Sequence, residues 1–436
     1  MFFKHNYFME EFLNRTSEQK KIESVFEKPS FGYITGRRRI GKTALLTHLC
    51  QKHKGFYHQA TESVAPVQLE HLSQELGETF DLFKQITPKT WSEFFALLDK
   101  ISLPKIFVLD EFPYLVASDP SLPSLLQKWI DHRLPKTKTL FLVSGSSQMM
   151  LYSQFLNQSS PLYGRSHLHL HLPPLSFNWF CKAHNLTPDE KSFSQYALLG
   201  GIPHYWKLLP KGSLLNQVDT LFFDPSSLLG EEAKNLLHDE GVTGNIPKAI
   251  LDLVGQGVSK PSELAGRLGI PHGNLSRPLS VLLDLGILER EIPFGESVRT
   301  TKKILYRIND PLLAFHYGVV IHQNKMWPVF SDKEKHELIN VAISHQWEKY
   351  CRNFFPGSAR YWDKNREIDL IAPLKEGKEL LVGECKWMNL NTKEEENLMQ
   401  KLKEKWNQTA LSQTYSKVRF RVFSKKDISS MATGWL

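Results

Sequence analysis

A loop pattern near the start of the chain constrains its fold more than any other feature. Residues 36–43 read Gly-Arg-Arg-Arg-Ile-Gly-Lys-Thr and match the pattern Gly-x-x-x-x-Gly-Lys-Thr. An apolar run at 31–35 precedes the pattern, and a run with helical character at 44–49 follows it. A strand, a glycine loop and a helix N-terminus in this order collect backbone N–H groups into a cradle for phosphate. We therefore expect an α/β domain that binds a nucleotide, because a chance glycine turn would lack both flanking elements.

The residues of this loop have distinct expected roles. Gly36 and Gly41 allow backbone angles that a side chain would block. Lys42 can reach the β- and γ-phosphates of ATP, and the hydroxyl of Thr43 can ligate Mg²⁺, so the expected cofactors are ATP and Mg²⁺. The expected nucleotide-binding residues are Gly36, Arg37, Arg38, Arg39, Ile40, Gly41, Lys42, Thr43, Ala44, Asp110 and Ser144.

Two carboxylates follow a second strongly apolar run. Residues 105–109 predict a buried parallel strand that ends at Asp110 and Glu111. Ligands in such sheets bind at the carboxyl ends of the strands, so we expect Asp110 to hold Mg²⁺ and Glu111 to orient or deprotonate the attacking water. The alternative is a pair of surface acids after a core strand. A third apolar run, 140–143, ends at Ser144, which can contact the γ-phosphate, although serine also commonly ends strands.

Composition and charge narrow the class of protein. The 436 residues suggest two to four domains. The formal charge of +8 favours an anionic partner, but charge alone does not separate nucleic acid from a solvated basic surface. The four cysteines show no metal-binding spacing and suggest reduced thiols in a cytoplasmic protein. No apolar run of about 18 residues is present, so we expect no contact with a membrane.

The predicted organisation has four parts. Residues 1–172 form a P-loop NTPase core with a parallel sheet, and 173–243 form a helical lid. Residues 244–318 form a winged helix-turn-helix, and 330–436 form a small α/β nuclease-like domain. The predicted fold class is therefore α/β, because both the first part and the last part combine a sheet with helices.

The third part carries the pattern of a DNA-binding module. Helices are expected near 246–253, 262–268 and 274–285, and strands of a wing near 287–290 and 303–308. We expect DNA as a partner, and the alternative is a winged helix used for packing against protein. The candidate DNA contacts are His272, Asn274, Ser276, Arg277, Arg299, Lys302 and Lys303.

The last part holds a second constellation of charged residues. Glu384 and Lys386 lie two residues apart on a predicted strand, so their side chains share one face. Asp369 on a neighbouring strand can complete a carboxylate pair for a metal ion, Lys386 can activate a water, and Glu348 on a flanking helix can support the site. The alternative is an amphipathic strand with ordinary surface charges, in a domain that only binds. The expected metal ligands are Thr43 and Asp110 at the nucleotide, and Asp369 and Glu384 in the tail.

Taken with the phosphate loop, further motifs along the chain give a resemblance to a known class. The chain resembles the archaeal-type ATPases of the signal-transducing STAND class, which implies ATP hydrolysis. In that class Arg165 stands where an arginine faces the γ-phosphate, so the resemblance implies Lys42, Glu111 and Arg165 as ATPase residues. The segments that carry the resemblance are 12–15, 35–43, 109–112, 144–146, 161–165, 174–177 and 199–203.

The tail resembles the DUF234 domain, which is similar to the PD-(D/E)XK nucleases. The matched positions are Asp369, Glu384 and Lys386, although Ile368 stands where the proline of the superfamily's name would be. We therefore expect an ATP-hydrolysing protein that couples its nucleotide state to a winged-helix and nuclease-like tail acting on DNA. The alternative is an ATP-dependent switch with an inert tail, which assembles with protein partners or as a homo-oligomer.

Overall fold

The computed structural model describes residues 14–434, except Glu27, 146–150, Tyr152, Ser153, Leu156, Thr243 and Val298. Phe12, Leu13 and Ser146, which contribute to the resemblance above, lie outside the described residues. The chain forms two compact units, Met1–Pro174 and Leu175–Leu436. None of the described helices combines the length and the apolar content that a membrane crossing needs.

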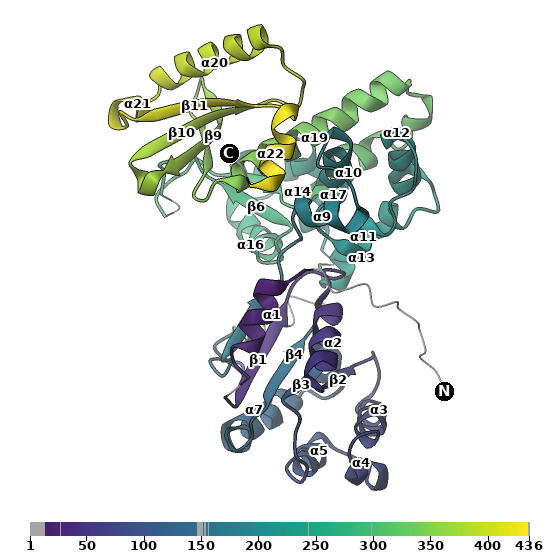
Figure 1. Ribbon diagram of the computed structural model, residues 1–436. Helices are drawn as coiled ribbons and strands as arrows, with labels where there is room; N and C mark the ends of the chain where they lie inside the picture. The colour runs from purple at the N-terminus through teal and green to yellow at the C-terminus, as the bar shows by residue number, and fades with distance from the viewer. Residues whose placement is uncertain are drawn as a thin grey trace. The chain divides into compact units, whose positions relative to one another are not determined.

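A five-stranded parallel sheet organises the first unit, with helices on either side of the strands (Figure 1). The strand order is β2-β3-β4-β1-β5. The strands are β1 (Ser30–Thr35), β2 (Phe56–Gln59), β3 (Ile106–Asp110), β4 (Leu140–Ser144) and β5 (Leu168–His171). The helices are α1 (Thr16–Glu23), α2 (Lys42–His53), α3 (Ala65–Gly77), α4 (Asp81–Gln85), α5 (Trp91–Leu98), α6 (Phe112–Ser118), α7 (Leu122–His132) and the 3₁₀ turn η1 (Leu134–Lys136).

The central strands β3 and β4 are buried along their whole length, because helices cover both faces of the sheet. One face carries Phe107 and Phe141, whose rings stack at 5.0 Å, and it packs on α3, α5 and α7. Helix α2 packs on β2 and β3. All five strands run parallel, so their carboxyl ends share one edge, and the predicted α/β class with a parallel sheet is confirmed.

Helices dominate the first part of the second unit. They are α9 (Phe177–His184), α10 (Glu190–Leu199), α11 (Pro203–Trp206), α12 (Leu214–Val218), the π-helix η2 (Asp219–Phe223) and α13 (Leu228–Asp239). Three helices and a hairpin follow: α14 (Asn245–Gly255), α15 (Pro261–Leu268), the 3₁₀ turn η3 (His272–Leu275), α16 (Ser276–Asp284), β6 (Leu288–Glu291) and β7 (Leu305–Ile308). The strands β6 and β7 pair antiparallel. The connection to the tail comprises α17 (Pro311–Phe315), the π-helix η4 (His316–Val320), α18 (Ile321–Gln323) and η5 (Trp327–Val329).

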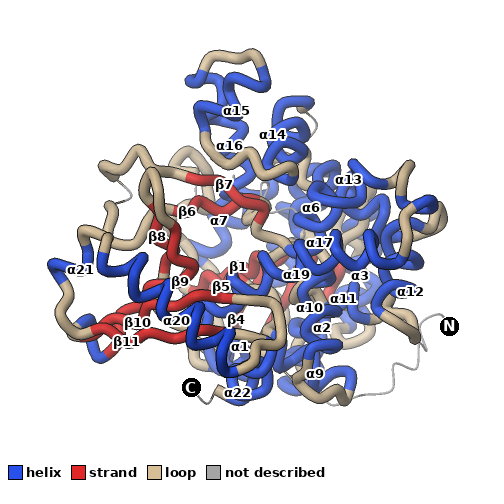
Figure 2. Tube along the Cα trace, turned by 90° about the horizontal axis from the view of Figure 1, so that it is seen from above, coloured by secondary structure: helices blue, strands red, loops and turns tan. Residues whose placement is uncertain are grey.

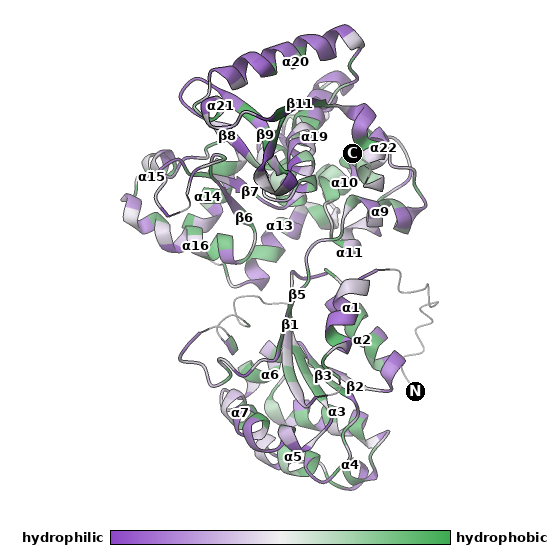
Figure 3. Ribbon diagram, turned by 60° about the vertical axis from the view of Figure 1, so that its left-hand side comes forward, coloured by the Kyte–Doolittle hydropathy of each residue, from purple (hydrophilic) through white to green (hydrophobic). Residues whose placement is uncertain are grey.

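A four-stranded mixed sheet of order β11-β10-β9-β8 forms the tail. Its elements are α19 (Asp332–Phe354), β8 (Ala359–Trp362), β9 (Glu367–Leu374), η6 (Lys375–Gly377), β10 (Glu379–Cys385), α20 (Thr392–Asn407), α21 (Leu411–Thr414), β11 (Val418–Phe423), η7 (Lys425–Asp427) and α22 (Ile428–Thr433). Helix α20 buries Leu402 and Trp406 against β9 and β10, and its remaining surface is strongly polar (Figure 3). Helix α19 packs on β9 and β10 and buries Trp347 completely.

Candidate nucleotide site and the carboxylate cluster of the tail

The loop between β1 and α2 has the backbone that its glycines predict. Gly36 has φ 148° and Gly41 has φ 96°, which are angles that residues with a side chain rarely adopt. A Cβ atom on Gly36 would lie 3.0 Å from the carbonyl oxygen of Leu172. The Lys42 ammonium donates to the carbonyl oxygens of Gly36 at 2.7 Å and Arg37 at 3.1 Å, and the residue is buried. The loop therefore holds a cation and the N-terminus of α2 together, as phosphate binding requires.

Asp110 is the centre of a hydrogen-bond cluster at the carboxyl edge of the sheet. The Thr43 hydroxyl donates to its Oδ2 atom at 2.7 Å, and Thr43 is the second residue of α2. The Tyr57 hydroxyl donates to the same oxygen at 2.9 Å. The hydroxyl of Ser144 and the backbone N–H of Glu111 donate to Oδ1, the latter at 3.0 Å. Asp110 is fully buried, so these four donors replace the water that a carboxylate would otherwise hold.

The donor set around Asp110 fits a magnesium nucleotide. Mg²⁺ takes oxygen ligands and usually binds through one or two protein side chains plus substrate phosphates. Thr43 and Asp110 supply a hydroxyl and a carboxylate that already touch, next to the Lys42 ammonium in the loop. Glu111 follows Asp110 with φ 55°, a left-handed backbone that is uncommon outside glycine and often marks a functional position.

The structure does not bring Arg165 to this edge. Its guanidinium pairs with Asp131 near the end of α7, with Nε–Oδ1 at 2.9 Å, and donates to the carbonyl oxygen of Pro161. Arg165 precedes β5, and the parallel register pairs Leu168 with Gly32, so Arg165 lies beyond the amino end of β1. Gly36 follows the carboxyl end of β1, and the six residues of that strand separate the two ends by about 20 Å. Arg165 therefore lies at the opposite end of the sheet from the phosphate loop of this chain, and its expected role at the γ-phosphate stays a prediction.

Three residues that sequence reasoning missed lie at or near the loop. Tyr57 reaches Asp110 from the edge strand β2. Arg15 is buried and donates to the carbonyl oxygen of Ile40 at 3.3 Å and to Glu18 at 3.1 Å. Burial lowers the pKa of His171, and the positive charges of His169, Lys42 and Arg15 lower it further. Tyr57 belongs to none of the motifs above, and the contacts of Arg15 and His171 near the loop follow only from the tertiary structure.

The tail brings its four predicted residues together. The antiparallel register pairs Gly383 with Leu370, so the next residues, Glu384 and Asp369, stand opposite each other on one face. The Lys386 ammonium lies 2.8 Å from Oε1 of Glu384 and 3.8 Å from Oδ2 of Asp369. The backbone N–H of Cys385 donates to Asp369 at 2.8 Å. Both carboxylates are buried, as a site that controls water would be.

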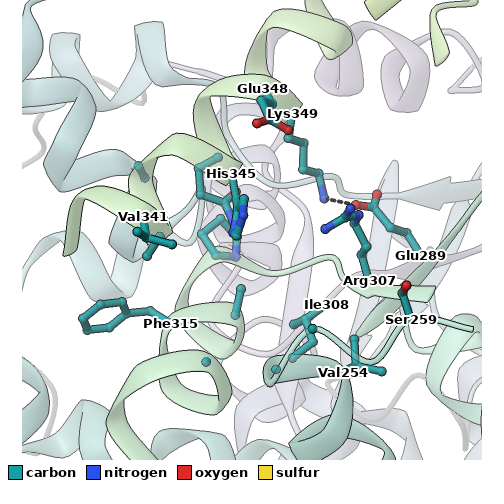
Figure 4. Close-up of a pocket in the computed structure, with 18 of the residues that line it drawn as sticks. Val254, Ser259, Glu289, Arg307, Ile308, Phe315, Val341, His345, Glu348 and Lys349 are labelled. Carbon is teal, nitrogen blue, oxygen red and sulfur yellow. Dashed lines mark hydrogen bonds and ion pairs between the residues drawn. The ribbon is translucent and has the colours of Figure 1, made fainter. Parts of the chain in front are cut away.

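The electrostatics of this cluster connect it to α19. Burial raises the pKa of Asp369, and the neighbouring carboxylate of Glu384 raises it further. Burial and the charge of Asp369 raise the pKa of Glu348 to about 7, so these acids lie close enough to oppose each other's ionisation. Glu348 also lines a cavity of about 180 Å³ between α19 and the β6–β7 hairpin. Figure 4 shows Glu348 and Lys349 on this helix, with the 2.8 Å ion pair between Lys349 and Glu289.

A second lysine, which the sequence analysis missed, also pairs with the carboxylate of Glu384. The Lys405 ammonium extends from α20 to both oxygens of Glu384, at 3.0 and 3.2 Å. Lys386 and Lys405 together balance the charge of Glu384 and Asp369. Among the described residues, no group of three or more His, Cys, Asp and Glu side chains has the arrangement of a metal site. The two carboxylates and Glu348 are the oxygen donors that a divalent ion in the tail would use.

Comparison with known proteins follows the same division of the chain. Residues 12–209 match a family described as an ATPase domain predominantly from Archaea. Residues 324–418 match DUF234, described as archaeal and bacterial proteins of unknown function. An uncharacterized protein of Methanocaldococcus jannaschii, MJECL04, is 28% identical over 400 residues, which are 88% of this chain and 89% of that protein.

A solved structure supports the fold of the ATPase part. The Walker-type ATPase PABY2304 of Pyrococcus abyssi aligns with a TM-score of 0.53 at 19% identity, covering 70% of this chain and 96% of that one. At this identity the similarity concerns the fold. The chain thus carries an ATPase domain of the predominantly archaeal family, followed by a DUF234 domain in its tail.

Proposed function

We propose that this chain hydrolyses ATP in a Mg²⁺-dependent reaction and uses its nucleotide state to control a tail that cleaves DNA. The contact that carries the ATPase part is the 2.7 Å hydrogen bond between Thr43 and Asp110, because it joins the phosphate loop to the acidic strand end. Family membership of residues 12–209 supports the same activity.

Each residue at this edge has a chemical task in the proposal. The Lys42 ammonium moves from the carbonyl oxygens of the loop to the phosphates and balances their charge. Asp110 and Thr43 would hold Mg²⁺, which when bound neutralises charge on the phosphate oxygens. Glu111 orients the attacking water and accepts its proton. Ser144 keeps Asp110 oriented through its hydrogen bond to Oδ1.

Two substitutions test the ATPase proposal. Lys42→Ala removes the point charge that binds phosphate, so ATP binding measured by calorimetry should be lost. Glu111→Gln keeps the shape of the side chain but not the base, so binding should remain and turnover should fall by at least about 10²-fold. Wild-type affinity for ATP in Lys42→Ala would overturn the assignment of the site.

The tail proposal rests on the convergence of Asp369, Glu384 and Lys386. Two carboxylates and a lysine on one sheet face are suited to phosphodiester hydrolysis, in which a bound Mg²⁺ would stabilise the charge of the transition state. Lys386 would orient the attacking water. We propose residues 244–318 as a winged helix-turn-helix that holds DNA, with the chain divided at 1–172, 173–243, 244–318 and 330–436.

Cleavage assays test the tail separately from the ATPase. Wild-type protein with Mg²⁺ or Mn²⁺ should nick DNA, and Glu384→Ala and Lys386→Ala should each abolish nicking while ATP hydrolysis persists. Nicking that survives in Glu384→Ala would come from another site or a contaminant. The two activities then fail independently, which identifies the part of the proposal that is wrong.

A specific contact favours a second candidate function. Lys386 and Lys405 both pair with Glu384, so the carboxylate that would bind a metal is already neutralised. The tail would then be inert, and the chain would be a nucleotide switch that assembles with protein partners or with itself. A salt titration of DNA affinity separates the candidates, because phosphate contacts weaken steeply with salt. No DNA binding at low salt would favour the switch.

A further inference from the structure

A basic groove separates the β6–β7 hairpin from the tail sheet. It has a volume of about 420 Å³, and its walls are the residues before α15, strand β7, strand β8 and the turn from β8 to β9. These elements lie side by side in Figure 2. Five cationic side chains and two carboxylates line it, so its field favours an anion. The cations are Lys260, Arg307, Arg360, Lys364 and Arg366.

A cluster of arginines lies beside the groove, and two of its members, Arg307 and Arg360, line it. Arg307, Arg360 and Arg352 pair with the single carboxylate of Glu291 at 2.8, 2.9 and 3.2 Å. Burial raises the pKa of Glu291, but the three guanidinium groups outweigh burial and hold that pKa below its ordinary value. Burial lowers the pKa of Arg360, and the charge of Arg307 lowers it further. Arg360 also pairs with Glu367. Two carboxylates still do not balance the charge of three guanidinium groups, so a bound anion would reduce the repulsion between the arginines.

The rim of the groove offers cations that the protein itself does not use. Lys260 and Lys364 are exposed, and neither makes an ion pair within the described residues 14–434. Trp362 is half-buried and also lines the groove, where it offers an aromatic surface. A cationic track with an aromatic side chain is the combination that binds single-stranded nucleic acid, since phosphates meet the cations and unpaired bases stack on the ring.

Ion pairs and a hydrogen bond link the arginines at the groove to the carboxylate cluster of the tail. Arg360 in the groove wall and Arg352 share the carboxylate of Glu291, at 2.9 and 3.2 Å. Arg352 also donates to the backbone carbonyl of Asp369 at 3.4 Å. Glu291 and Arg352 thus link Arg360 in the groove wall to the backbone of Asp369.

We propose that this groove binds single-stranded nucleic acid and guides it toward Asp369 and Glu384. The inference rests on the proposed action of the tail on DNA and names the form of its substrate. The groove has a volume of about 420 Å³, so it is suited to a short piece of flexible single strand whose bases are free to meet Trp362. Any unpaired base can stack on the ring of Trp362, because every base has an aromatic face, so we expect binding that tolerates different sequences.

The test compares strands and variants by fluorescence anisotropy of the full chain. The probes are fluorescent oligomers of about 20 thymidines, about 20 uridines, and the thymidine oligomer paired with its complement. Wild type should bind the single strand more tightly than the duplex. The double variant Lys260→Glu/Lys364→Glu should bind the single strand at least ~10-fold more weakly at low salt, with a salt slope smaller by at least about 1.4, because each lost contact to a single strand contributes about 0.7.

A matched control carries the same change in charge elsewhere in the second unit. Lys191→Glu/Lys211→Glu alters two other exposed lysines and should leave the affinity and the salt slope unchanged. Equal affinity of Lys260→Glu/Lys364→Glu and wild type, or tighter binding of the duplex by wild type, would overturn the groove but leave DNA cleavage by the tail intact. No binding of any probe by wild type would overturn both. The uridine and thymidine arms decide between RNA and DNA.

Discussion

The Tyr57 hydroxyl donates a 2.9 Å hydrogen bond to Oδ2 of Asp110, the oxygen that also accepts from Thr43. Burial raises the pKa of Tyr57, and the charge of Asp110 raises it further, so the phenol stays protonated as a donor. When Thr43 turns toward a metal-bound nucleotide, Tyr57 is positioned to keep the carboxylate oriented. Tyr57 is thus a positioning residue at the edge of the site.

Tyr57→Phe should weaken the binding of Mg²⁺ at the ATPase site. One lost hydrogen bond to a charged group costs about 1.5–3 kcal/mol, so the Mg²⁺ concentration for half-maximal turnover should rise by roughly 10-fold or more. Turnover at saturating Mg²⁺ should change little. Tyr114→Phe, on α6, is the control and should titrate as wild type. An unchanged Mg²⁺ titration of Tyr57→Phe would remove the positioning role.

Arg165→Ala should leave basal ATP turnover of the monomer within about twofold of wild type. The side chain pairs with Asp131 at the amino end of the sheet and does not reach the loop of its own chain. Such partly exposed pairs contribute less than about 1 kcal/mol to stability, so urea unfolding should shift only slightly. Asp131→Asn should give the same small shift. A tenfold loss of turnover in dilute Arg165→Ala would contradict this placement.

The sequence predicted the two charged sites because each is anchored by a strand whose pattern is local. Continuous apolar runs placed Asp110 at a strand end, and the spacing of two placed Glu384 and Lys386 on one face. The position of Arg165 at the amino end of the sheet could not be predicted, because it depends on the direction of β5 relative to β1, which no local pattern encodes. Lys405 was missed because it lies on a strongly charged helix, where a lysine that faces solvent and a lysine that binds a carboxylate cannot be told apart from the sequence.

His316 should make the second unit less stable in acid. Burial lowers the pKa of this histidine to about 4, with a further lowering from Lys234, so the folded protein keeps it neutral. Between pH about 6.5 and about 4 the unfolded chain binds a proton that the folded chain does not, so stability falls as the pH falls. The loss approaches roughly 3.5 kcal/mol, since the pKa differs by about 2.5 units and each unit is worth about 1.4 kcal/mol.

Urea unfolding at several pH values measures this linkage. In His316→Phe the fall in stability between pH about 6.5 and about 4 should be smaller than in wild type. The exposed residue His272, changed to Gln, is the control and should keep the wild-type profile. A profile of His316→Phe parallel to that of wild type would show that this histidine does not remain neutral in the folded protein.

Glu291→Gln should destabilise the junction between the hairpin and the tail sheet. The substitution leaves Arg307, Arg352 and Arg360 buried or partly buried without their shared anion, and breaking a buried ion pair typically costs about 3–5 kcal/mol. The urea midpoint of the second unit should fall accordingly. Glu296→Gln removes an exposed partner of Lys303 and should leave the midpoint unchanged. Equal midpoints for the two variants would show that the guanidinium cluster does not depend on Glu291.

Lys405→Met should increase the affinity of the tail for Mn²⁺. Lys405 donates to both oxygens of Glu384, so a metal ion must displace this ammonium before it can bind. Hydrogen bonds between charged groups are worth about 1.5–3 kcal/mol, so removing the competitor should tighten Mn²⁺ binding by roughly 10-fold. Calorimetry without nucleotide measures the Mn²⁺ affinity. All variants are made in a parent protein that carries Glu111→Gln/Asp110→Asn, which removes the ATPase metal site.

Lys401→Met, one turn earlier on α20, is the control and should bind Mn²⁺ as the parent protein does. Weaker Mn²⁺ binding in Lys405→Met would mean that Lys405 supports the metal site, and an unchanged affinity would mean that Glu384 is not a ligand.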